Sequence, residues 1–399
     1  MTREDAARLA HELADAVNHH DIPRLLALYS ANAVTVSPVV GEVAGIEAIR
    51  NWWERVFSLF PDWQVKTHDL LLDGDRLAFF GTAGATDRNG WFGQVPTGEP
   101  FEYRAIIVLT MANGKIVRDE RIYDLSALLQ RLEKARQDRE LRLAASVQRA
   151  LLSRTRRSTP HGEAVGDSIP CRAIGGDFFE TALLPSGDLA IALGDVSGKG
   201  PSAALLAAWV QGMFAVQLQV DPTPATTVAQ LNQLLVSRHV DSRFVTLVYG
   251  VLSPNGRFVC CNAGHNPVIA LTNKGVQRVG CGGPVLGLFA DSTFEQENLI
   301  LEPGSTIIMF SDGAVEATDA QGCEFGDDRL LAAVRAGRNL PESELLRALL
   351  ESVQQHSRGV PQEDDITVLV TRYRRPSGNV ENAAINDDQD GAPASPARF

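Results

Sequence analysis

The stretch LAIALGDVSGKGPSAALLAAWVQGMFAV, residues 189–216, decides how the second half of the chain is interpreted. It begins with a wholly apolar run, which is typical of a strand buried on both faces, although a buried helical turn would give the same pattern. The run leads into Asp195. After it, Gly198 and Gly200 allow a tight turn, and Pro201 suits the first turn of the Ala- and Leu-rich helix that follows. The stretch therefore predicts an aspartate at the end of a buried strand, on a glycine loop.

Three further stretches place aspartates in the same way. CRAIGGDFFE contains Asp177 after two glycines, and TIIMFSDGAVEA contains Asp312 between an apolar run and a glycine. QEDDITVLVTRY contains Asp364 and Asp365 directly before a β-branched run. Any one of these aspartates is easily explained as a turn residue, but their recurrence in one domain favours a shared chemistry.

Carboxylates grouped in this way are typical ligands of hard divalent cations, which prefer oxygen donors. Glycines let the backbone approach closely and leave room for bound water. Carboxylates from separate strands can hold two cations about 3.5–4 Å apart, with a bridging water whose lowered pKa prepares it to attack phosphorus. The recurring aspartates therefore predict a two-metal hydrolytic site.

Composition argues against several other classes of protein. The chain has 399 residues, which favours two or three domains, and its formal net charge of −12 argues against general binding of nucleic acid. Its five cysteines are odd in number and form no C-x-x-C pair, which argues against a disulfide framework or a zinc site. We find no secretory signal and no long apolar span, and we expect a cytoplasmic protein that does not bind membranes.

The first segment, residues 1–125, predicts an α+β domain. Apolar residues at helical spacing indicate helices, and these precede strand pairs that turn at Asp73-Gly74 and Asn113-Gly114, an antiparallel meander. VNHHDIPRLLALYSANAV, GIEAIRNWWERVFSLFPDW, VPTGEPFEYRAIIVLTMANGKIVRDERIYD and LSALLQRL resemble SnoaL-like domains of the nuclear-transport-factor-2-like superfamily. The resemblance implies a cone-shaped α+β barrel around an apolar pocket. We interpret this segment as a sensor for an unidentified small ligand or protein.

Aromatic residues of this segment could line the pocket, although plain core packing explains most of them as well. These residues are Trp53, Phe57, Phe80, Trp91, Tyr103 and Tyr123. Polar residues nearby are candidates for an acid or a base, but a lone histidine or carboxylate on a strand is more often solvated. These residues are His68, Asp69, Glu120 and Asp124. An isomerase or hydrolase activity of this segment is an alternative that the sequence supports less well than ligand sensing.

Residues 126–157 predict a helical connector without glycine or proline. One apolar stripe has the spacing of a coiled-coil seam, and a second stripe follows after an interruption that resembles a stutter. The stripes are Leu125, Leu128, Leu132 and Ala135, then Leu143, Val147 and Leu151. An amphipathic helix packed on its own domain remains an open alternative. We expect Arg154, Arg156 and Arg157 to close the helix as a basic patch, and the connector to pair in a homodimer.

Across residues 158–375, a series of motifs resembles the SpoIIE/RsbU-type branch of the metal-dependent type-2C protein phosphatases. The motifs are GGDFFE, GDVSGKG, FVTLVYGVL, NAGHNP, GGPVLGL, FSDGAVEATDAQG and EDDITVLV. The resemblance implies an αββα sandwich, with two antiparallel sheets flanked by helices. It also implies removal of phosphate from phosphoserine or phosphothreonine with manganese or magnesium. It places metal ligation on Asp177, Asp195, the Val196 carbonyl, Asp312, Asp364 and the adjacent Asp365.

Two other residues of this domain are candidates for a part in catalysis. Arg172 lies just upstream of Asp177, where an arginine could contact the phosphate, although an exposed structural arginine explains it equally well. His265 in NAGHNP could protonate a leaving group, but we favour a structural role in its loop. Residues 376–399 are rich in Pro, Gly, Asn and Asp and predict a disordered tail.

Together these features predict a sensor–phosphatase. By resemblance, its substrate is the phosphorylated anti-sigma-factor antagonist of a partner-switching pathway, a small STAS-domain protein. Input at the first domain would move the connector and complete or disrupt the metal site. Two alternatives remain open: a catalytically silent module that sequesters the antagonist, and a phosphatase for another signalling protein.

Overall fold

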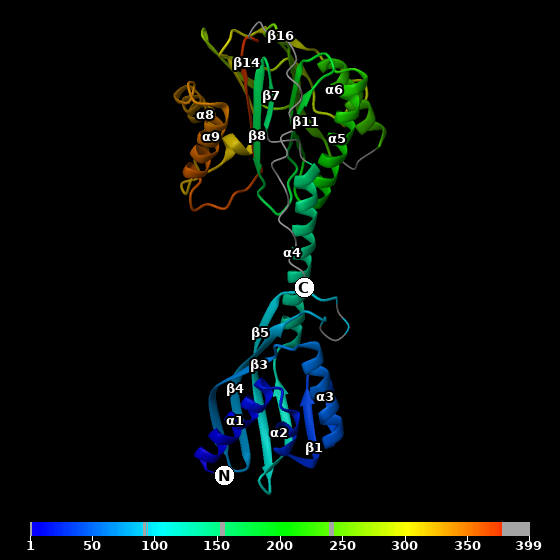
Figure 1. Cartoon of the computed structure of the whole chain (residues 1–399), viewed down its shortest axis with the longest axis vertical. Coiled ribbons are helices and arrows are strands. Elements are labelled where there is room, and N and C mark those ends of the chain that lie inside the picture. Colours follow the sequence, from blue (N-terminus) through cyan, green and yellow to red (C-terminus); the bar gives the residue numbers. More distant parts are fainter. Residues whose placement is uncertain (1, 91–92, 94, 152–155, 239–242, 377–399) are drawn as a thin grey trace. The chain divides into compact units, whose positions relative to one another are not determined.

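The computed structural model describes residues 2–90, 93, 95–151, 156–238 and 243–376 (Figure 1). The chain separates into two compact units, Met1–Leu141 and Arg142–Phe399, and the division falls within helix α4 (Leu125–Leu151). The tail that we expected to be disordered lies outside the described residues, apart from its first residue.

In the described part of unit 1, six strands form one sheet in the order β2-β1-β6-β5-β4-β3. The helices are α1 (Arg3–Asn18), α2 (Ile22–Ala27) and α3 (Ile46–Leu59), and the strands are β1 (Tyr29–Ser37), β2 (Gly41–Ala44), β3 (Gln64–Asp73), β4 (Arg76–Thr86), β5 (Pro100–Ala112) and β6 (Lys115–Ile122). Both predicted hairpins are confirmed. The turn of β5 and β6 has positive φ at Asn113 (51°) and Gly114 (73°), as a two-residue hairpin turn requires.

The predicted order of helices followed by an antiparallel meander is wrong in one respect. Strands β1 and β2 lie between α2 and α3, and β1 pairs in parallel with β6. A parallel pair needs a long crossover connection, so no hairpin turn marks it in the sequence. The sheet of unit 1 is therefore mixed, although the α+β class is confirmed.

The connector helix divides its apolar residues between two environments. Leu128 and Leu132 are buried in the hydrophobic core of unit 1, and Leu125 packs against that core. For this first stripe the amphipathic alternative therefore holds, and the coiled-coil interpretation is wrong. In the second stripe, Leu143 and Val147 are 60% and 58% exposed.

The basic patch expected at the end of α4 is not formed by the arginines that the structure describes. Arg156 and Arg157 lie in strand β7 (Arg156–Thr159), and Arg156 Nε is 2.6 Å from Glu163 Oε1. Strand pairing with β8 therefore replaces the expected helix end. Arg154 and the side chain of Leu151 lie outside the described residues.

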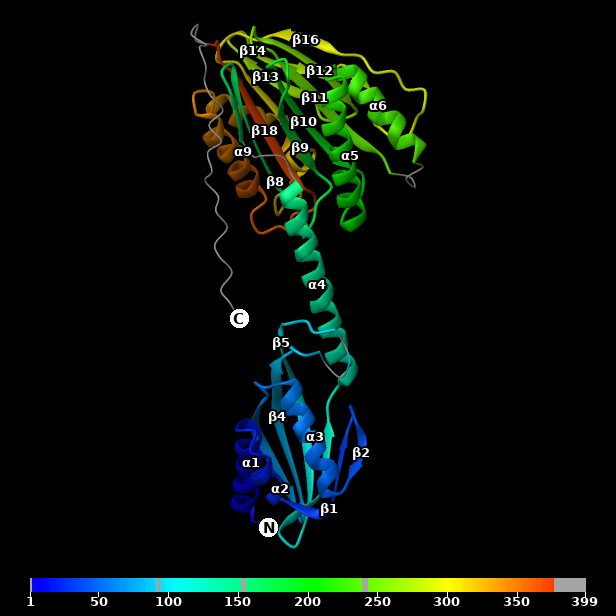
Figure 2. The same cartoon turned by 45° about the vertical axis from the view of Figure 1, so that its right-hand side comes forward.

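Unit 2 is a sandwich of two sheets between helical layers (Figure 2). One sheet has the order β15-β12-β11-β10-β9, with β16 paired to β12, and the other has the order β14-β13-β17-β18-β8-β7. Apart from the short parallel pairing of β12 with β15, the neighbouring strands are antiparallel. Helices α5 and α6 share a core with the first sheet, and α8 and α9 share a core with the second. This arrangement confirms the αββα sandwich.

The bounds of these elements are β8 (Gly162–Ile169), β9 (Phe178–Leu183), β10 (Leu189–Val196), α5 (Pro201–Val220), α6 (Pro224–Ser237), β11 (Val245–Leu252), β12 (Arg257–Ala263), β13 (Val268–Thr272), β14 (Gly275–Val279), β15 (Gly282–Gly283), β16 (Glu297–Ile300), β17 (Thr306–Phe310), α7 (Gly313–Glu316), α8 (Gly326–Ala336), α9 (Glu342–His356) and β18 (Ile366–Tyr373). A third apolar cluster, with Phe179, Ile191 and Met309 among its members, fills the space between the sheets. The interior is thus closed, and the site must lie at an end of the strands.

Helix α5 corrects one expectation drawn from composition. Its 20 residues are long and apolar enough to cross a membrane, so the statement that the sequence has no long apolar span is wrong by this criterion. Half of the helix is buried, and Val210 and Phe214 pack in the core beneath the first sheet. A core helix meets the same criterion, so α5 is weak evidence for a membrane span.

Candidate metal centre

Strand β10 delivers Asp195 to an end of the sandwich. The strand lies between β9 and β11, and its residues from Leu189 to Leu193 are buried, as the sequence predicted. Gly200 precedes α5 with φ of 84°, and Pro201 is the first helical residue. The chain therefore turns sharply just after Asp195, which keeps this carboxylate at the strand end.

The other aspartates come from corresponding places in the two sheets. Asp177 directly precedes β9, which belongs to the same sheet as Asp195. Asp312 follows β17 and caps the short helix α7, and Asp364 lies just before β18. Since β17 and β18 are neighbours in the second sheet, each sheet contributes a pair of carboxylates.

Electrostatic coupling shows that these carboxylates form one cluster. Burial, followed by the charge of Asp195, raises the pKa of Asp177 well above its ordinary value. Burial and the charge of Asp312 raise the pKa of Asp195 to about 7. Burial and the charge of Asp364 raise the pKa of Asp312. The cluster therefore cannot be fully ionised at neutral pH unless cations offset its charge.

Asp177 is oriented by a residue of the opposite sheet. Thr367 Oγ1 in β18 donates to Asp177 Oδ2 at 2.5 Å, and it is also 2.8 Å from Ser168 Oγ in β8. Thr367 is fully buried. This contact ties the loop before β9 to the second sheet and fixes the direction of the carboxylate.

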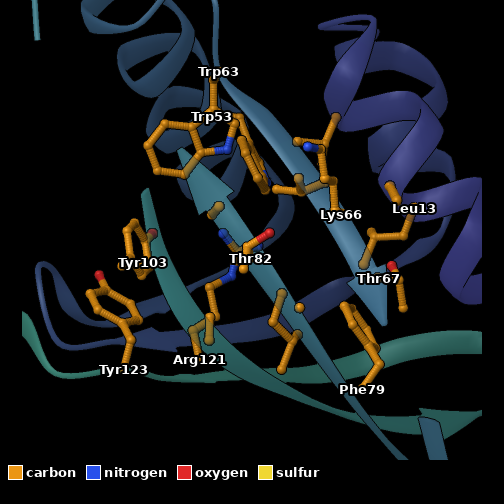
Figure 3. A pocket seen from close by; sticks show the side chains of 17 residues that line it. Leu13, Trp53, Trp63, Lys66, Thr67, Phe79, Thr82, Tyr103, Arg121 and Tyr123 are labelled. Carbon is orange, nitrogen blue, oxygen red and sulfur yellow. The ribbon is translucent and has the colours of Figure 1, made fainter. Parts of the chain in front are cut away.

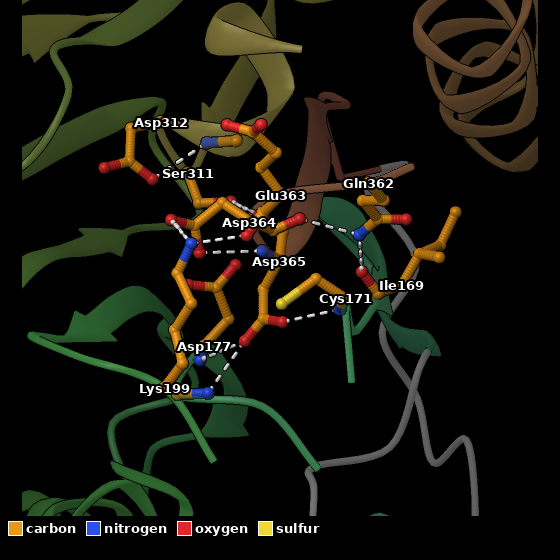
Figure 4. A network of polar contacts seen from close by, with 12 residues as sticks. Ile169, Cys171, Asp177, Lys199, Ser311, Asp312, Gln362, Glu363, Asp364 and Asp365 are labelled. Carbon is orange, nitrogen blue, oxygen red and sulfur yellow. Dashed lines mark hydrogen bonds and ion pairs between the residues drawn. The ribbon is translucent and has the colours of Figure 1, made fainter. Parts of the chain in front are cut away.

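Asp365, expected as a metal ligand, makes hydrogen bonds that the sequence did not predict. Its Oδ1 accepts the Cys171 N–H at 2.8 Å, and its Oδ2 accepts the N–H groups of Gly176 at 2.7 Å and Asp177 at 3.4 Å (Figure 4). Both oxygens therefore accept hydrogen bonds from the loop that carries Asp177, and the carboxylate holds this loop in place. An Asp365 oxygen also lies within 4.8 Å of a carboxylate oxygen of Asp364 and of the Cys171 thiol, so metal ligation by Asp365 stays a prediction.

The Val196 carbonyl lies at the cluster, as expected. A Cβ added at Gly176 would lie 2.9 Å from Val196 O and 3.4 Å from Asp195 Oδ1. The loop before Asp177 therefore passes close over the end of β10, and a side chain at Gly176 would press on the carbonyl. This close approach explains the second glycine of the GGDFFE motif.

Lys199 belongs to the site, although the sequence analysis did not single it out. Its Nζ is 3.0 Å from Asp364 Oδ2, and it also donates to the Glu363 carbonyl. The hydrogen bond with Asp364 raises the pKa of Lys199, which remains a cation at neutral pH. Its place between the two glycines of GDVSGKG was the signal that could have found it.

Arg172 and His265 occupy different environments. Arg172 is exposed, and its Nη1 is 3.8 Å from a Cβ added at Gly200, which places it beside the glycine loop rather than among the carboxylates. His265 is buried, with Nδ1 2.8 Å from Thr246 Oγ1, and burial lowers its pKa to about 4. A neutral imidazole in this position supports the structural role that we favoured.

A polar cavity opens beside the cluster. Its volume is about 230 Å³, and it extends from Lys199 and Asp364 toward α7 and the segment that precedes β18. Cys171 lies at the edge of the same site, with its thiol within 4.8 Å of carboxylate oxygens of Asp364 and Asp365. The cluster is thus open to a ligand on this side.

Unit 1 has a separate apolar cavity of about 50 Å³ (Figure 3). Of the expected aromatic residues, Trp53, Tyr103 and Tyr123 line it. Phe57 instead lies in the core, Phe80 is 36% exposed, and Trp91 lies outside the described residues. The expected pocket is therefore present, but it is small and only half of the predicted aromatic residues surround it.

Arg121, which the sequence analysis missed, is one of the polar residues that line this cavity. Its Nη2 donates to Asp119 Oδ2 at 2.7 Å, and its guanidinium carbon lies 4.5 Å from the Trp53 ring centroid. The expected polar candidates His68, Asp69, Glu120 and Asp124 are not among the residues that line the cavity. An acid–base pair for catalysis in unit 1 is therefore not supported by the described residues.

The comparisons agree with this architecture. Residues 185–374 match the family model of Stage II sporulation protein E (SpoIIE), and residues 10–119 match the model of the SnoaL-like domain. The chain joins a SnoaL-like domain to a SpoIIE-type domain. Asp195, Asp312 and Asp364 lie within the SpoIIE match, whereas Asp177 lies just before it. The structure, not the family match, therefore adds Asp177 to the site of the SpoIIE-type domain.

Curated relatives of the SpoIIE-type domain include phosphatases. Protein IcfG of Synechocystis sp. is 30% identical over 238 residues, which cover 51% of this chain and 37% of the relative. Phosphoserine phosphatase RsbU of Bacillus subtilis is 30% identical over 190 residues, which cover 46% of this chain and 55% of the relative. The chain thus spans about half or less of the length of these relatives.

A solved structure supports the fold of the SpoIIE-type domain. The SiaA-PP2C domain of Pseudomonas aeruginosa has a TM-score of 0.53 and 20% sequence identity, and the alignment covers 60% of this chain and 98% of that domain. At this identity the likeness shows the fold alone. Unit 2 therefore has the fold of a PP2C domain.

Proposed function

We propose that this chain is a metal-dependent protein serine/threonine phosphatase. The observation that carries the proposal is the cluster of carboxylates with raised pKa values at the strand ends of a SpoIIE-type sandwich. Relatives of this domain are named phosphoserine phosphatases. A buried group of carboxylates without compensating cations would be costly, and divalent cations are the natural partners of such an oxygen-rich site.

Asp177, Asp195, Asp312, Asp364 and the Val196 carbonyl would hold two manganese or magnesium ions. Their donors are all oxygens, which fits both ions. When bound, such ions neutralise charge on the phosphoryl group and make water acidic enough to attack phosphorus at neutral pH. These residues are the ligands expected from the sequence except Asp365, whose carboxylate makes hydrogen bonds with the loop before Asp177.

The remaining residues of the site orient the ligands and attract the substrate. Thr367 fixes the Asp177 carboxylate, and Asp365 holds the loop that precedes it. Lys199 and the exposed Arg172 place positive charge near an otherwise acidic site. In the proposal, Arg172 contacts the phosphate of the incoming residue, which a guanidinium does well through paired hydrogen bonds.

The proposed substrate is a phosphorylated STAS-domain anti-sigma-factor antagonist. This assignment rests on the likeness of the SpoIIE-type domain to RsbU and RsbP of Bacillus subtilis. In the proposal, an input at unit 1 shifts α4 and changes the activity of the site, and the protein acts in the cytoplasm. The exposed Leu143 and Val147 on α4 support pairing of two copies.

The test is phosphate release from a phosphoserine STAS protein by the full chain with Mn²⁺, compared with Asp195→Asn. Turnover that requires Mn²⁺ and disappears in Asp195→Asn supports the proposal. Tight binding of the phosphorylated protein without turnover, at saturating Mn²⁺, would instead indicate a silent sequestering module. Turnover of phosphorylated kinases but not of STAS proteins would refute the proposed substrate, although it would still support a phosphatase activity.

A further inference from the structure

The last turns of α4 are joined to the loop before Asp177 through Gln148. Gln148 Nε2 donates to the Gly175 carbonyl at 2.8 Å, and its Oε1 accepts the Gly175 N–H at 3.3 Å. One side-chain amide thus binds both polar groups of a single residue, as a neighbouring strand would. Gln148 is half-buried, and Ala145, one turn earlier on the same face of the helix, is buried. The C-terminal part of α4, which belongs to unit 2, therefore contacts the loop before Asp177.

Gly175 is also in direct contact with Asp365. A Cβ added at Gly175 would overlap Asp365 Oδ2, so only a glycine lets the backbone lie on this carboxylate. The same oxygen accepts the N–H groups of Gly176 and Asp177. The loop is therefore held by Asp365 and by Gln148 together, and it ends in Asp177, a member of the carboxylate cluster.

We propose that Gln148 is a positioning residue of the metal centre, which fixes Gly175 and thereby sets the affinity of the centre for divalent cations. The inference rests on the proposed function, because it requires that Asp177 is a ligand. Gln148 contacts the loop, not the cluster, so it acts through the placement of Asp177. The last turns of α4 are then part of the metal centre, and withdrawal of Gln148 weakens metal binding without loss of any ligand.

The proposal also concerns where the phosphatase unit begins. The boundary that we predicted from the sequence, Ser158, excludes Gln148, whereas the compact unit of the structure begins at Arg142 and includes it. A helix that supplies a contact to the ligand loop is a direct route by which a change in α4 reaches the site. Loss of the contact between the Gln148 side chain and Gly175 would be sufficient for this effect.

The experiment is isothermal titration of Mn²⁺ into the metal-free full chain at pH 8, without substrate. Gln148→Ala removes both hydrogen bonds, and we expect Mn²⁺ binding to weaken by about 10-fold or more, as for other residues that orient metal ligands. Gln148→Glu keeps an acceptor for the Gly175 N–H but cannot donate to the carbonyl, and it should also bind Mn²⁺ more weakly than the native chain. The matched control is Gln137→Ala, on the same helix, where the side chain is exposed and donates to Glu133 Oε1 at 3.0 Å. This control should keep the native affinity.

Kinetics separate positioning from general damage. In Gln148→Ala, the Mn²⁺ concentration for half-maximal rate should rise with the dissociation constant, while kcat at saturating Mn²⁺ stays within about twofold. Hydrogen exchange of residues 171–177 should become faster. Native Mn²⁺ affinity in both Gln148 variants would overturn the inference, and so would an equal loss in Gln137→Ala. Absence of Mn²⁺ binding by the native chain would refute the proposed function itself.

Discussion

The carboxylate cluster makes the stability of metal-free unit 2 depend on pH in an unusual direction. The pKa of Asp195 is raised from 3.8 to about 7 in the folded chain. The folded state therefore holds a proton that the unfolded state releases, and stability is lost as pH rises through this window. We predict that unit 2, stripped of divalent cations by a chelator, unfolds more easily at pH 8 than at pH 5.

The magnitude follows from the shift of this one group. Each tenfold change in proton affinity is worth about 1.4 kcal/mol. The rise of the Asp195 pKa from 3.8 to about 7 therefore lowers the free energy of unfolding by about 4 kcal/mol once the pH lies above both values. Since part of the window lies below pH 5, about 3 kcal/mol should be lost between pH 5 and pH 8. Mn²⁺ at pH 8 should restore the lost stability, because the ions bind the folded state.

Hydrogen exchange of the buried amides of β10 measures this effect in unit 2 alone. After correction for intrinsic rates, protection in chelator should fall by about 100-fold between pH 5 and pH 8, which is about 3 kcal/mol. Asp195→Asn should reduce this fall, whereas Asp291→Asn, at an exposed position, should keep it. Equal or greater protection of the native chain at pH 8 in chelator would refute the reasoning.

Three other predictions concern residues around the site and the connector. Asp365→Ala leaves the N–H groups of Cys171, Gly176 and Asp177 without their acceptor. Chemical denaturation should show unit 2 destabilised by about 2–4 kcal/mol, more than in Asp365→Asn. Native stability in both variants would contradict this prediction. His265→Gln should lower the melting temperature of unit 2. It should leave the pH–rate profile unchanged near pH 6.5, because the buried imidazole is already neutral at that pH. Loss of a limb of the pH–rate profile would instead indicate a catalytic role. The double variant Leu143→Glu, Val147→Glu should halve the mass measured by sedimentation equilibrium, since it places charge on the exposed stripe of α4; an unchanged mass would exclude pairing through this stripe.

The carboxylate cluster was largely predictable because its signals are local. Asp177, Asp195 and Asp312 each adjoin a strand and a glycine, and both features can be read within a few residues. The sandwich that brings them together was predictable only through the resemblance of the motif series. Spacing along the chain alone would not have placed Asp177 beside Asp195.

The contacts that the sequence did not predict join distant segments. Asp365 was expected only as a ligand beside Asp364, and its hydrogen-bond partners Cys171 and Gly176 lie far away in the sequence. Gln148 resembles any polar residue on an exposed helix, and only the structure shows its contact with Gly175. Such partners leave no periodic or motif signal in a single sequence.

In unit 1, the side of the sheet that each residue faces could not be derived from the meander pattern alone. Phe80 and Arg121 were assigned by residue type, the first to the pocket and the second to no role. The structure reverses both, since Phe80 is partly exposed and Arg121 pairs with the buried Asp119 at the cavity. The pairing of strand β1 with β6 was not predicted, because parallel strands are not joined by a hairpin turn.

The most direct test of the metal centre is calorimetric titration of Mn²⁺ into the metal-free native chain and into Asp195→Asn, in buffers of different ionisation enthalpy. The native chain should bind two ions and release protons at pH 6, because the raised pKa of Asp195 leaves it protonated before binding. Asp195→Asn should bind Mn²⁺ much more weakly and release fewer protons. Failure of the native chain to bind Mn²⁺, or equal binding and proton release by Asp195→Asn, would contradict the assignment of this cluster as a metal centre.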